Sequence, residues 1–271
     1  MERSLAAAVS GINAEQTYLD TIGNNIANSS TDGYKQQDVL FSDLLTQRIN
    51  GATAPVPPAL GGVNPTYVGS GVAVAGIVAD NSEGAIRQTG VASNAAIQGT
   101  GYFVVTQNGQ QVFTRAGDFS VDSGGDLVTA SGGLVQSTAG APIKIQVGAA
   151  GPTGGTLTSY SIGADGVITG TYSNGTSAPI ATVALATFPN NQGLNNLGNS
   201  YYSVSANSGA ATIGAPGTGA AGTLQGGAVE ASNVNLAQQL TDLVSAQTNY
   251  AANTKVVATT SQVLQTLIQN A

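Results

Sequence analysis

The sequence predicts an α+β protein in which two terminal α-helices pair as a coiled coil beside a central antiparallel all-β domain. One observation is a repeat of apolar residues at alternating steps of four and three near both ends of the chain, which is typical of coiled-coil helices. The other is a middle section of short β-rich runs separated by glycine turns. We expect the helices in residues 1–35 and 229–271, an extended connector in residues 36–67 and the β domain in residues 68–228.

The two terminal repeats form narrow seams that polar residues interrupt. Such helices are marginal alone, because they bury too little surface to offset the entropy lost on ordering. The alternative is a helical hairpin inside one ordinary domain, but a monomeric core favours a broader apolar face. We therefore expect both helices to mediate self-assembly through the seam residues Leu5, Val9, Ile12, Gln16, Leu19, Ile26, Leu236, Leu240, Leu243, Gln247, Tyr250, Val257, Leu264 and Ile268.

The first helix is expected to run from about Ser4, a candidate N-cap, to Ala27. A run of turn-forming residues from Asn28 to Gly33 follows it and signals the break. Residues 36–49 are compatible with a short helix or an extended arm. The Pro-rich stretch from Asn50 to Pro65 predicts an extended connector or a projecting loop.

The middle of the chain carries hairpin signals. Asn108-Gly109 lies between two β-rich runs, and this dipeptide favours a two-residue hairpin turn. A second hairpin is expected across Ser123 to Gly125, and further strands over residues 72–78, 143–147, 166–172, 180–188 and 201–204. The Gly- and Ala-rich residues 205–222 predict a flexible return to the C-terminal helix.

Composition excludes several classes of function. Only 8% of the 271 residues are charged, and Lys and Arg number 7 against 14 Asp and Glu, so a nucleic-acid partner is not expected. The chain has no Cys and no His, which removes disulfides, thiolate metal ligands and the commonest general base. We therefore expect no enzymatic activity, no catalytic residues, no metal and no cofactor.

The acidic residues Asp118, Asp122 and Asp126 are the one candidate cation loop. Their spacing does not fit an EF-hand, and a hairpin turn explains Asp122 to Asp126 without a metal. No apolar run reaches the roughly twenty residues needed to span a bilayer, so no membrane insertion is expected. The N-terminus lacks the pattern of a cleavable signal peptide, so a protein acting outside the cell would be exported by another route.

Several motifs resemble those of bacterial flagellar rod and hook proteins. The first runs through Asn24, Asn25 and Asn28 at the helix break to Thr31, Gly33, Tyr34 and Lys35. Residues 96–105 and 114–119 resemble the central β domain of this family, and residues 230–236 with Ala246, Gln247 and Tyr250 resemble its C-terminal helix. The stretches at residues 168–175 and 183–188 are more similar to hook proteins than to rod proteins. Two features depart from the pattern: residues 137–165 leave no room for the outer domain of hook proteins, and Thr248 stands where the family usually has Arg.

The resemblance implies a structural subunit of the flagellar hook that polymerises helically into a flexible universal joint transmitting torque. In that assembly the terminal helices form an inner tube and the β domain a surrounding layer. Its partners would be copies of itself and the rod, hook-cap and hook-filament junction proteins, and its location the extracellular flagellum, reached by flagellar export. The alternatives are a subunit of the stiff distal rod and, from another class, a secreted β-rich adhesin or cell-wall enzyme.

Overall fold

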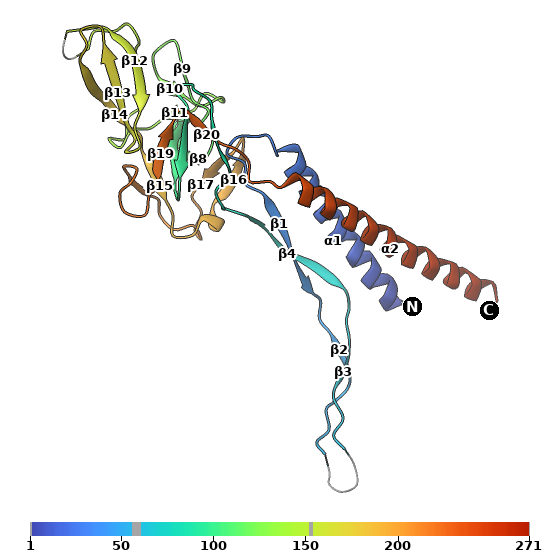
Figure 1. The fold of residues 1–271 in the computed structure, drawn as a ribbon. Coiled ribbons are helices and arrows are strands. Elements are labelled where there is room, and N and C mark those ends of the chain that lie inside the picture. The colour runs from blue at the N-terminus through green and yellow to red at the C-terminus, as the bar shows by residue number, and fades with distance from the viewer. Residues whose placement is uncertain (1, 56–60, 152–153, 271) are drawn as a thin grey trace. The chain divides into compact units, whose positions relative to one another are not determined.

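The computed structural model describes residues 2–55, 61–151 and 154–270 (Figure 1). The chain divides into two compact units. One, the helix–ribbon unit, contains Met1–Ala27, Gln37–Ala79 and Asn235–Ala271. The other, the β unit, contains Asn28–Gln36 and Asp80–Val234. This division confirms the predicted α+β class, while its boundaries differ from the predicted ones in the first third of the chain.

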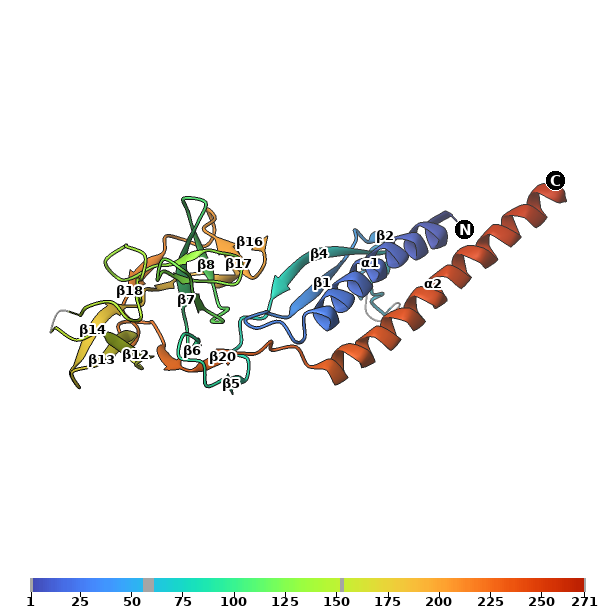
Figure 2. The ribbon, with the colours of Figure 1, turned by 90° about the horizontal axis from the view of Figure 1, so that it is seen from above.

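Two long helices dominate the helix–ribbon unit. Helix α1 spans Glu2–Ala27 and helix α2 spans Leu236–Gln269, and Figure 2 shows them lying alongside each other. Asn235 caps α2, because its side-chain oxygen accepts hydrogen bonds from the backbone N–H groups of Ala237 and Gln238. The predicted N-cap Ser4 is wrong, since α1 begins at Glu2 and Ser4 lies inside its first turn.

A two-stranded ribbon forms where the sequence predicts an extended connector. Strand β1 (Gln37–Asp43) pairs antiparallel with β4 (Val72–Ala79), and β2 (Gln47–Asn50) pairs with β3 (Thr66–Val68). The ribbon packs on α1 through an edge-on contact between the Tyr18 and Phe41 rings, whose centroids are 5.7 Å apart. Part of the Pro-rich stretch, residues 56–60, lies outside the described residues. The strand predicted over residues 72–78 forms as β4, whereas β1, β2 and β3 were not predicted, because their partners are distant in sequence and their side chains are mostly exposed.

A nine-stranded antiparallel sheet forms the centre of the β unit. Its main path runs in the order β16-β17-β8-β7-β11-β10-β9, and β15 joins β7 to β18. The strands are β7 (Tyr102–Gln107), β8 (Gln110–Thr114), β9 (Ser120–Val121), β10 (Leu127–Val128), β11 (Leu134–Val135), β15 (Leu185–Thr187), β16 (Asn195–Gly198), β17 (Tyr201–Ser203) and β18 (Thr212–Gly214).

Three smaller sheets complete this unit. A meander joins β12 (Leu157–Ile162), β13 (Val167–Tyr172) and β14 (Ser177–Thr182). Strand β6 (Ala95–Gln98) pairs with β19 (Thr223–Gly226), and β5 (Ile86–Gln88) pairs with β20 (Ala228–Glu230). The last two pairs join strands more than a hundred residues apart, so the end of the β unit returns to its beginning.

Both predicted hairpins form. Gln107 faces Gln110 across Asn108 and Gly109, which adopt φ angles of 51° and 78°, as a primed turn requires. In the β9–β10 hairpin the Asp122 side chain accepts hydrogen bonds from the N–H groups of Gly124 and Asp126. The strand predicted over residues 143–147 is wrong: Lys144 makes an isolated bridge to Asp126 and no continuous ladder follows.

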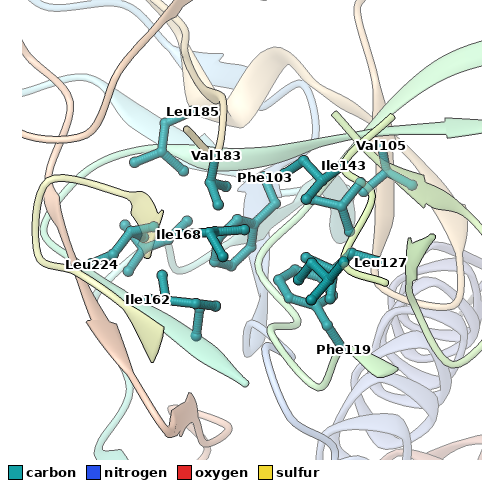
Figure 3. Packing of buried hydrophobic residues seen from close by; sticks show 14 of the residues in the cluster. Phe103, Val105, Phe119, Leu127, Ile143, Ile162, Ile168, Val183, Leu185 and Leu224 are labelled. Atoms are coloured by element: carbon teal, nitrogen blue, oxygen red, sulfur yellow. The ribbon is translucent and has the colours of Figure 1, made fainter. Parts of the chain in front are cut away.

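Two hydrophobic clusters stabilise the β unit. The larger contains Phe103, Leu127, Ile168, Leu185 and other side chains from the central sheet and the β12–β13–β14 meander, with the Phe103 and Phe119 rings in edge-on contact (Figure 3). The smaller lies on the other face of β7 and includes Tyr102, Val104 and Phe113. Tyr102 and Val104 face the smaller cluster, and Phe103 and Val105 face the larger one. Because both faces of β7 are buried, its sequence is a continuous apolar run rather than an alternating one.

Candidate functional site

The contact between α1 and α2 keeps a constant antiparallel register. A side chain at Gly11 would meet Asn253, Asn249 donates a hydrogen bond to Glu15 at 3.2 Å, and Asn25 donates one to Gln239 at 3.0 Å. Glycine at position 11 matters because an added Cβ would lie 2.7 Å from the Asn253 amide nitrogen. Close approach at this point sets the packing of the two helices.

The buried line of α1 is displaced by one residue from the predicted seam. Val9 is 43% exposed and Gln16 is also exposed, while Leu5, Ile12, Leu19 and Ile26 are half-buried. The buried positions are Ala8, Gly11, Ala14, Thr21, Ile22 and Asn25. Small residues permit closer contact between helix and neighbour than the larger ones that define the predicted seam. The structure therefore gives the predicted α1 seam a partial role inside the chain and leaves part of it exposed.

On α2 one of the two rows of the predicted seam is partly covered and the other is exposed. The covered row keeps a spacing of seven residues along the helix, and the fully buried residues lie one position before the exposed row. The half-buried seam residues are Leu243, Tyr250, Val257 and Leu264, and the exposed ones are Leu236, Leu240, Gln247 and Ile268. The fully buried α2 residues are Gln239, Ala246 and Thr260. Leu240 remains 52% exposed, and exposed aliphatic side chains continue at Val244, Val256, Val263 and Leu267.

The N-terminal motif is divided between the two units. In the helix–ribbon unit the buried Asn25 side chain donates to the carbonyl oxygen of Gln37 at 2.8 Å and accepts from its N–H at 2.9 Å. Asn24, one residue earlier, is exposed. The side chain of Asn25 therefore joins the end of α1, the start of β1 and, through Gln239, the first turns of α2.

The remaining motif residues belong to the β unit. Asn28 accepts a hydrogen bond from the Thr31 hydroxyl at 3.1 Å, which shapes the turn. Gly33 is buried with φ of +71°, and a Cβ there would lie 2.5 Å from the backbone nitrogen of Ala116. Its N–H donates to the carbonyl oxygen of Glu230 at 2.7 Å. Tyr34 is half-buried, and this burial raises its pKa. The motif thus brings the chain into contact with two distant segments.

Glu230 lies at the centre of a buried charge cluster. Its Oε1 accepts from the Lys35 ammonium at 2.6 Å and from the N–H of Gly84 at 2.9 Å, and its Oε2 lies 3.0 Å from Nε of Arg115. The Glu230 side chain is 0% exposed, and those of Lys35 and Arg115 are 3% and 5% exposed. Two cations therefore surround one carboxylate in a site from which water is largely excluded.

The two cations are also held by backbone carbonyl groups. Lys35 donates to the carbonyl oxygen of Ser82 at 2.7 Å, and Arg115 donates to those of Gly101 at 2.6 Å and Gly99 at 2.9 Å. Burial lowers the pKa of Lys35, and the Glu230 carboxylate opposes this effect. A buried ion cluster needs such additional hydrogen bonds to offset the free-energy cost of removing its charges from water.

Asn233 extends the cluster toward the end of the β unit. Its side-chain oxygen accepts from the N–H of Gln36 at 2.7 Å, and its amide nitrogen donates to the carbonyl oxygen of Asp80 at 2.9 Å and to the Ser82 hydroxyl at 3.1 Å. Asn233 thereby links the segments that contain Gln36 and Asp80. Both segments lead into the helix–ribbon unit along the chain.

The cluster unites three of the motif stretches. Lys35, Arg115 and Glu230 each lie in or at the end of one of these stretches, although the sequence predicts no role for any of them. A signal was present, because each is a charged residue inside a motif in a chain with only 8% charged residues. Their pairing could not be predicted from the sequence, because Lys35 and Glu230 are 195 residues apart.

A pocket of about 230 Å³ adjoins the cluster. Its lining includes Asn81, Glu83, Thr100 and Tyr102 in addition to the two cations. The Arg115 guanidinium lies 5.9 Å from the centroid of the Tyr102 ring. Because Arg115 is occupied by Glu230 and two carbonyl groups, this arrangement holds segments together rather than presenting a free reactive group.

The part of the chain that the structure describes contains neither a candidate metal site nor a candidate membrane-spanning helix. There, no group of three or more acidic residues is gathered as a metal site would require. Over the same residues, no helix combines the length and apolar character needed to cross a membrane.

Three family models match the chain. The Flagella basal body rod protein model matches residues 5–35, the Flagellar hook protein FlgE/F/G D1 domain model matches residues 96–170, and the Flagellar basal body rod FlgEFG protein C-terminal model matches residues 225–270. These spans contain Lys35, Arg115 and Glu230.

Relatives match over different lengths. The flagellar basal-body rod protein FlgG of Bacillus subtilis is 37% identical over 99% of this chain and 98% of its own, and that of Caulobacter vibrioides is 35% identical over 98% of both. The flagellar hook protein FlgE of Treponema pallidum is 45% identical, but over 45% of this chain and 26% of its own.

Proposed function

The chain belongs to the family of flagellar rod and hook proteins, and on this premise we propose that it is a distal-rod subunit that assembles with copies of itself into a stiff shaft. The observation that carries the proposal is the length of the matches. Relatives named basal-body rod proteins align from end to end, whereas the hook proteins align over less than half of this chain. The sequence motifs favoured the hook, and the full-length similarity favours the rod.

The exposed side chains of α2 support assembly. Leu236 is 46% exposed, Leu240 52% and Val244 62%, and these three residues follow one another at intervals of four along one side of the helix. Aliphatic side chains so arranged form the apolar stripe that helix packing uses. In the proposed shaft a neighbouring copy covers this stripe, in agreement with the predicted role of Leu236 and Leu240.

The buried charge cluster supports a mechanical role. Torque applied to one part of a subunit must pass through the chain segments that join its two units, and the ends of these segments are held by Glu230 and Asn233. The proposal assigns the protein no enzymatic activity and no cofactor. It places the protein in the flagellum, with other rod and hook proteins as neighbours.

Electron microscopy of the purified full-length protein at high concentration tests the proposal. We expect straight tubes; curved tubes would favour the hook, and separate particles at every concentration would contradict self-assembly. Leu240→Asp should abolish the tubes while leaving the circular dichroism of the monomer unchanged, because Leu240 is half exposed. Thr241→Asp, which places the same charge on the neighbouring exposed position, is the matched control and should still assemble.

A further inference from the structure

Three segments of the β unit form a small structure apart from its central sheet. They are residues 28–36, 80–88 and 228–234, called the latch segments below. Strands β5 and β20 of this group make a two-stranded sheet of their own. Neither hydrophobic cluster of the β unit includes a residue of the latch segments. They are therefore held to the rest of the unit by other means.

Polar contacts centred on Glu230 connect the latch segments to one another. Its carboxylate binds Lys35 of the first segment and the Gly84 N–H of the second, and its carbonyl oxygen accepts from the Gly33 N–H. Ala231 donates to the carbonyl oxygen of Ala85 at 2.9 Å. The segments also lie too close for a side chain at position 84, where a Cβ would collide with the carbonyl group of Ala231.

Glu230 is also a buried link between the latch segments and the body of the β unit, in addition to the hydrogen bonds that Glu83 accepts from the Gly99 N–H and Asn81 accepts from the Tyr102 hydroxyl. Arg115 follows β8 and is anchored to the carbonyl groups of Gly99 and Gly101, and its Nε pairs with Glu230. Without the carboxylate, Lys35 and Arg115 would be two buried cations that have lost the acidic group in contact with both of them. Removing one partner of a buried ion pair is strongly destabilising, because the charge left behind stays desolvated.

From this arrangement we propose that the latch segments are a single cooperative element that opens independently of the central sheet and that Glu230 keeps closed. All four passages of the chain between the two units begin or end in these segments, at residues 27/28, 36/37, 79/80 and 234/235. Opening the latch releases all of these attachments together. The latch thus switches the ends of these four chain connections between a state held by the Glu230 cluster and a released state. This property goes beyond the proposed role in the rod.

Native-state hydrogen exchange of the full-length monomer, read by mass spectrometry of peptides, tests the proposal. Peptides covering residues 30–36, 82–88 and 228–233 should exchange with one common free energy of opening, lower than that of a peptide covering β7 and β8. Glu230→Gln should accelerate exchange in all three by on the order of 100-fold or more, while β7 and β8 keep their protection.

The matched control is Arg87→Gln. Arg87 pairs with Asp32 at 3.3 Å between two latch segments, but the arginine side chain is 63% exposed, so its loss should change exchange less than about 5-fold. Equal acceleration of β7 and β8 in Glu230→Gln, or different responses among the three peptides, would overturn the proposal. Should Glu230→Gln not fold, wild-type exchange at low urea decides: a common sub-global opening supports the latch, and opening only with β7 and β8 refutes it.

Discussion

The Asn25 side chain of α1 donates a hydrogen bond to the Gln239 side chain of α2 at 3.0 Å, and both residues are buried. Asn25 also binds both backbone groups of Gln37 that face it. A buried polar pair between helices stabilises one register over its neighbours, because any shift leaves the polar atoms unpaired. This pair therefore fixes how the two terminal helices and the ribbon begin their packing.

Replacing Asn25 with Ala should lower the stability of the helix–ribbon unit by about 1–3 kcal/mol, because Gln37 and Gln239 lose a buried partner. Urea unfolding followed by circular dichroism at the helix band measures the loss. A double-mutant cycle with Gln239→Ala should reveal coupling of at least about 0.5 kcal/mol. Asn249→Ala, which removes an exposed contact to Glu15 between the same helices, should cost less, and equal costs would contradict the register role.

Gly33→Ala should destabilise the β unit more than Gly90→Ala. Both glycines have φ of +71°, so both substitutions carry the strain of a left-handed alanine, about 1–2 kcal/mol. Only at position 33 would the new Cβ also press on Ala116 and Arg115, whereas at position 90 no atom of the described residues, apart from the glycine and its chain neighbours, lies within 4 Å of it. The difference between the two urea midpoints isolates the steric effect, and identical midpoints would show that the backbone moves aside freely.

Phe103→Ala should cost about 3–5 kcal/mol, since this ring is fully buried in the larger hydrophobic cluster and contacts the Phe119 ring. The tyrosine fluorescence of the β unit, followed through urea unfolding, gives the value. Leu197→Ala on the edge strand β16 removes a side chain that is 59% exposed and should change stability by less than about 0.5 kcal/mol. A small loss of stability for Phe103→Ala would mean that the surrounding side chains move to fill the cavity left by the ring.

Alkaline pH should unfold the protein partly through Tyr202. Burial raises the pKa of Tyr202, and the neighbouring Tyr102 adds to the rise. Above a pH of about 10 the unfolded chain releases this proton while the native state keeps it, so stability falls as the pH increases.

Lys35 has the opposite effect on the pH dependence of stability, and its effect occurs at lower pH. Its pKa is lowered by burial, so the unfolded state binds the extra proton and stability rises with pH up to about 10.5. The measurement is therefore made above that pH. Tyr202→Phe should reduce the fall there by up to about 1.4 kcal/mol per pH unit, the effect of one proton. An unchanged slope would exclude Tyr202 from the effect.

Local patterns were sufficient to predict the helices and the two hairpins. The periodic terminal segments, the turn formers after Ala27 and the Asn108-Gly109 dipeptide each act within a few residues, and all mark the correct elements. The pairing of β1 with β4 was not predicted, although residues 72–78 were predicted as a strand, because the paired residues lie far apart in sequence and their side chains show no buried alternation. Local sequence patterns do not indicate which strands pair when the two strands are far apart along the chain.

The details of the site were beyond the reach of the sequence. The predicted α1 seam lies one residue from the buried line, because large side chains define the seam and the small Ala8, Gly11 and Ala14 allow the close contact. Lys35, Arg115 and Glu230 were missed because burial, not composition, gives them their role. A charged residue is expected to be exposed to solvent when only its sequence is known, because its burial depends on segments that are distant along the chain.

The exposed aliphatic line on α2 also has a geometric consequence. Leu236, Leu240 and Val244 are spaced by four, and residues with this spacing form a ridge inclined by about 26° to the helix axis, so a partner helix that packs along the ridge crosses α2 at an angle. Subunits joined along this line would each be rotated relative to the one before. The rotation between neighbouring subunits of the shaft would then follow from the spacing of Leu236, Leu240 and Val244.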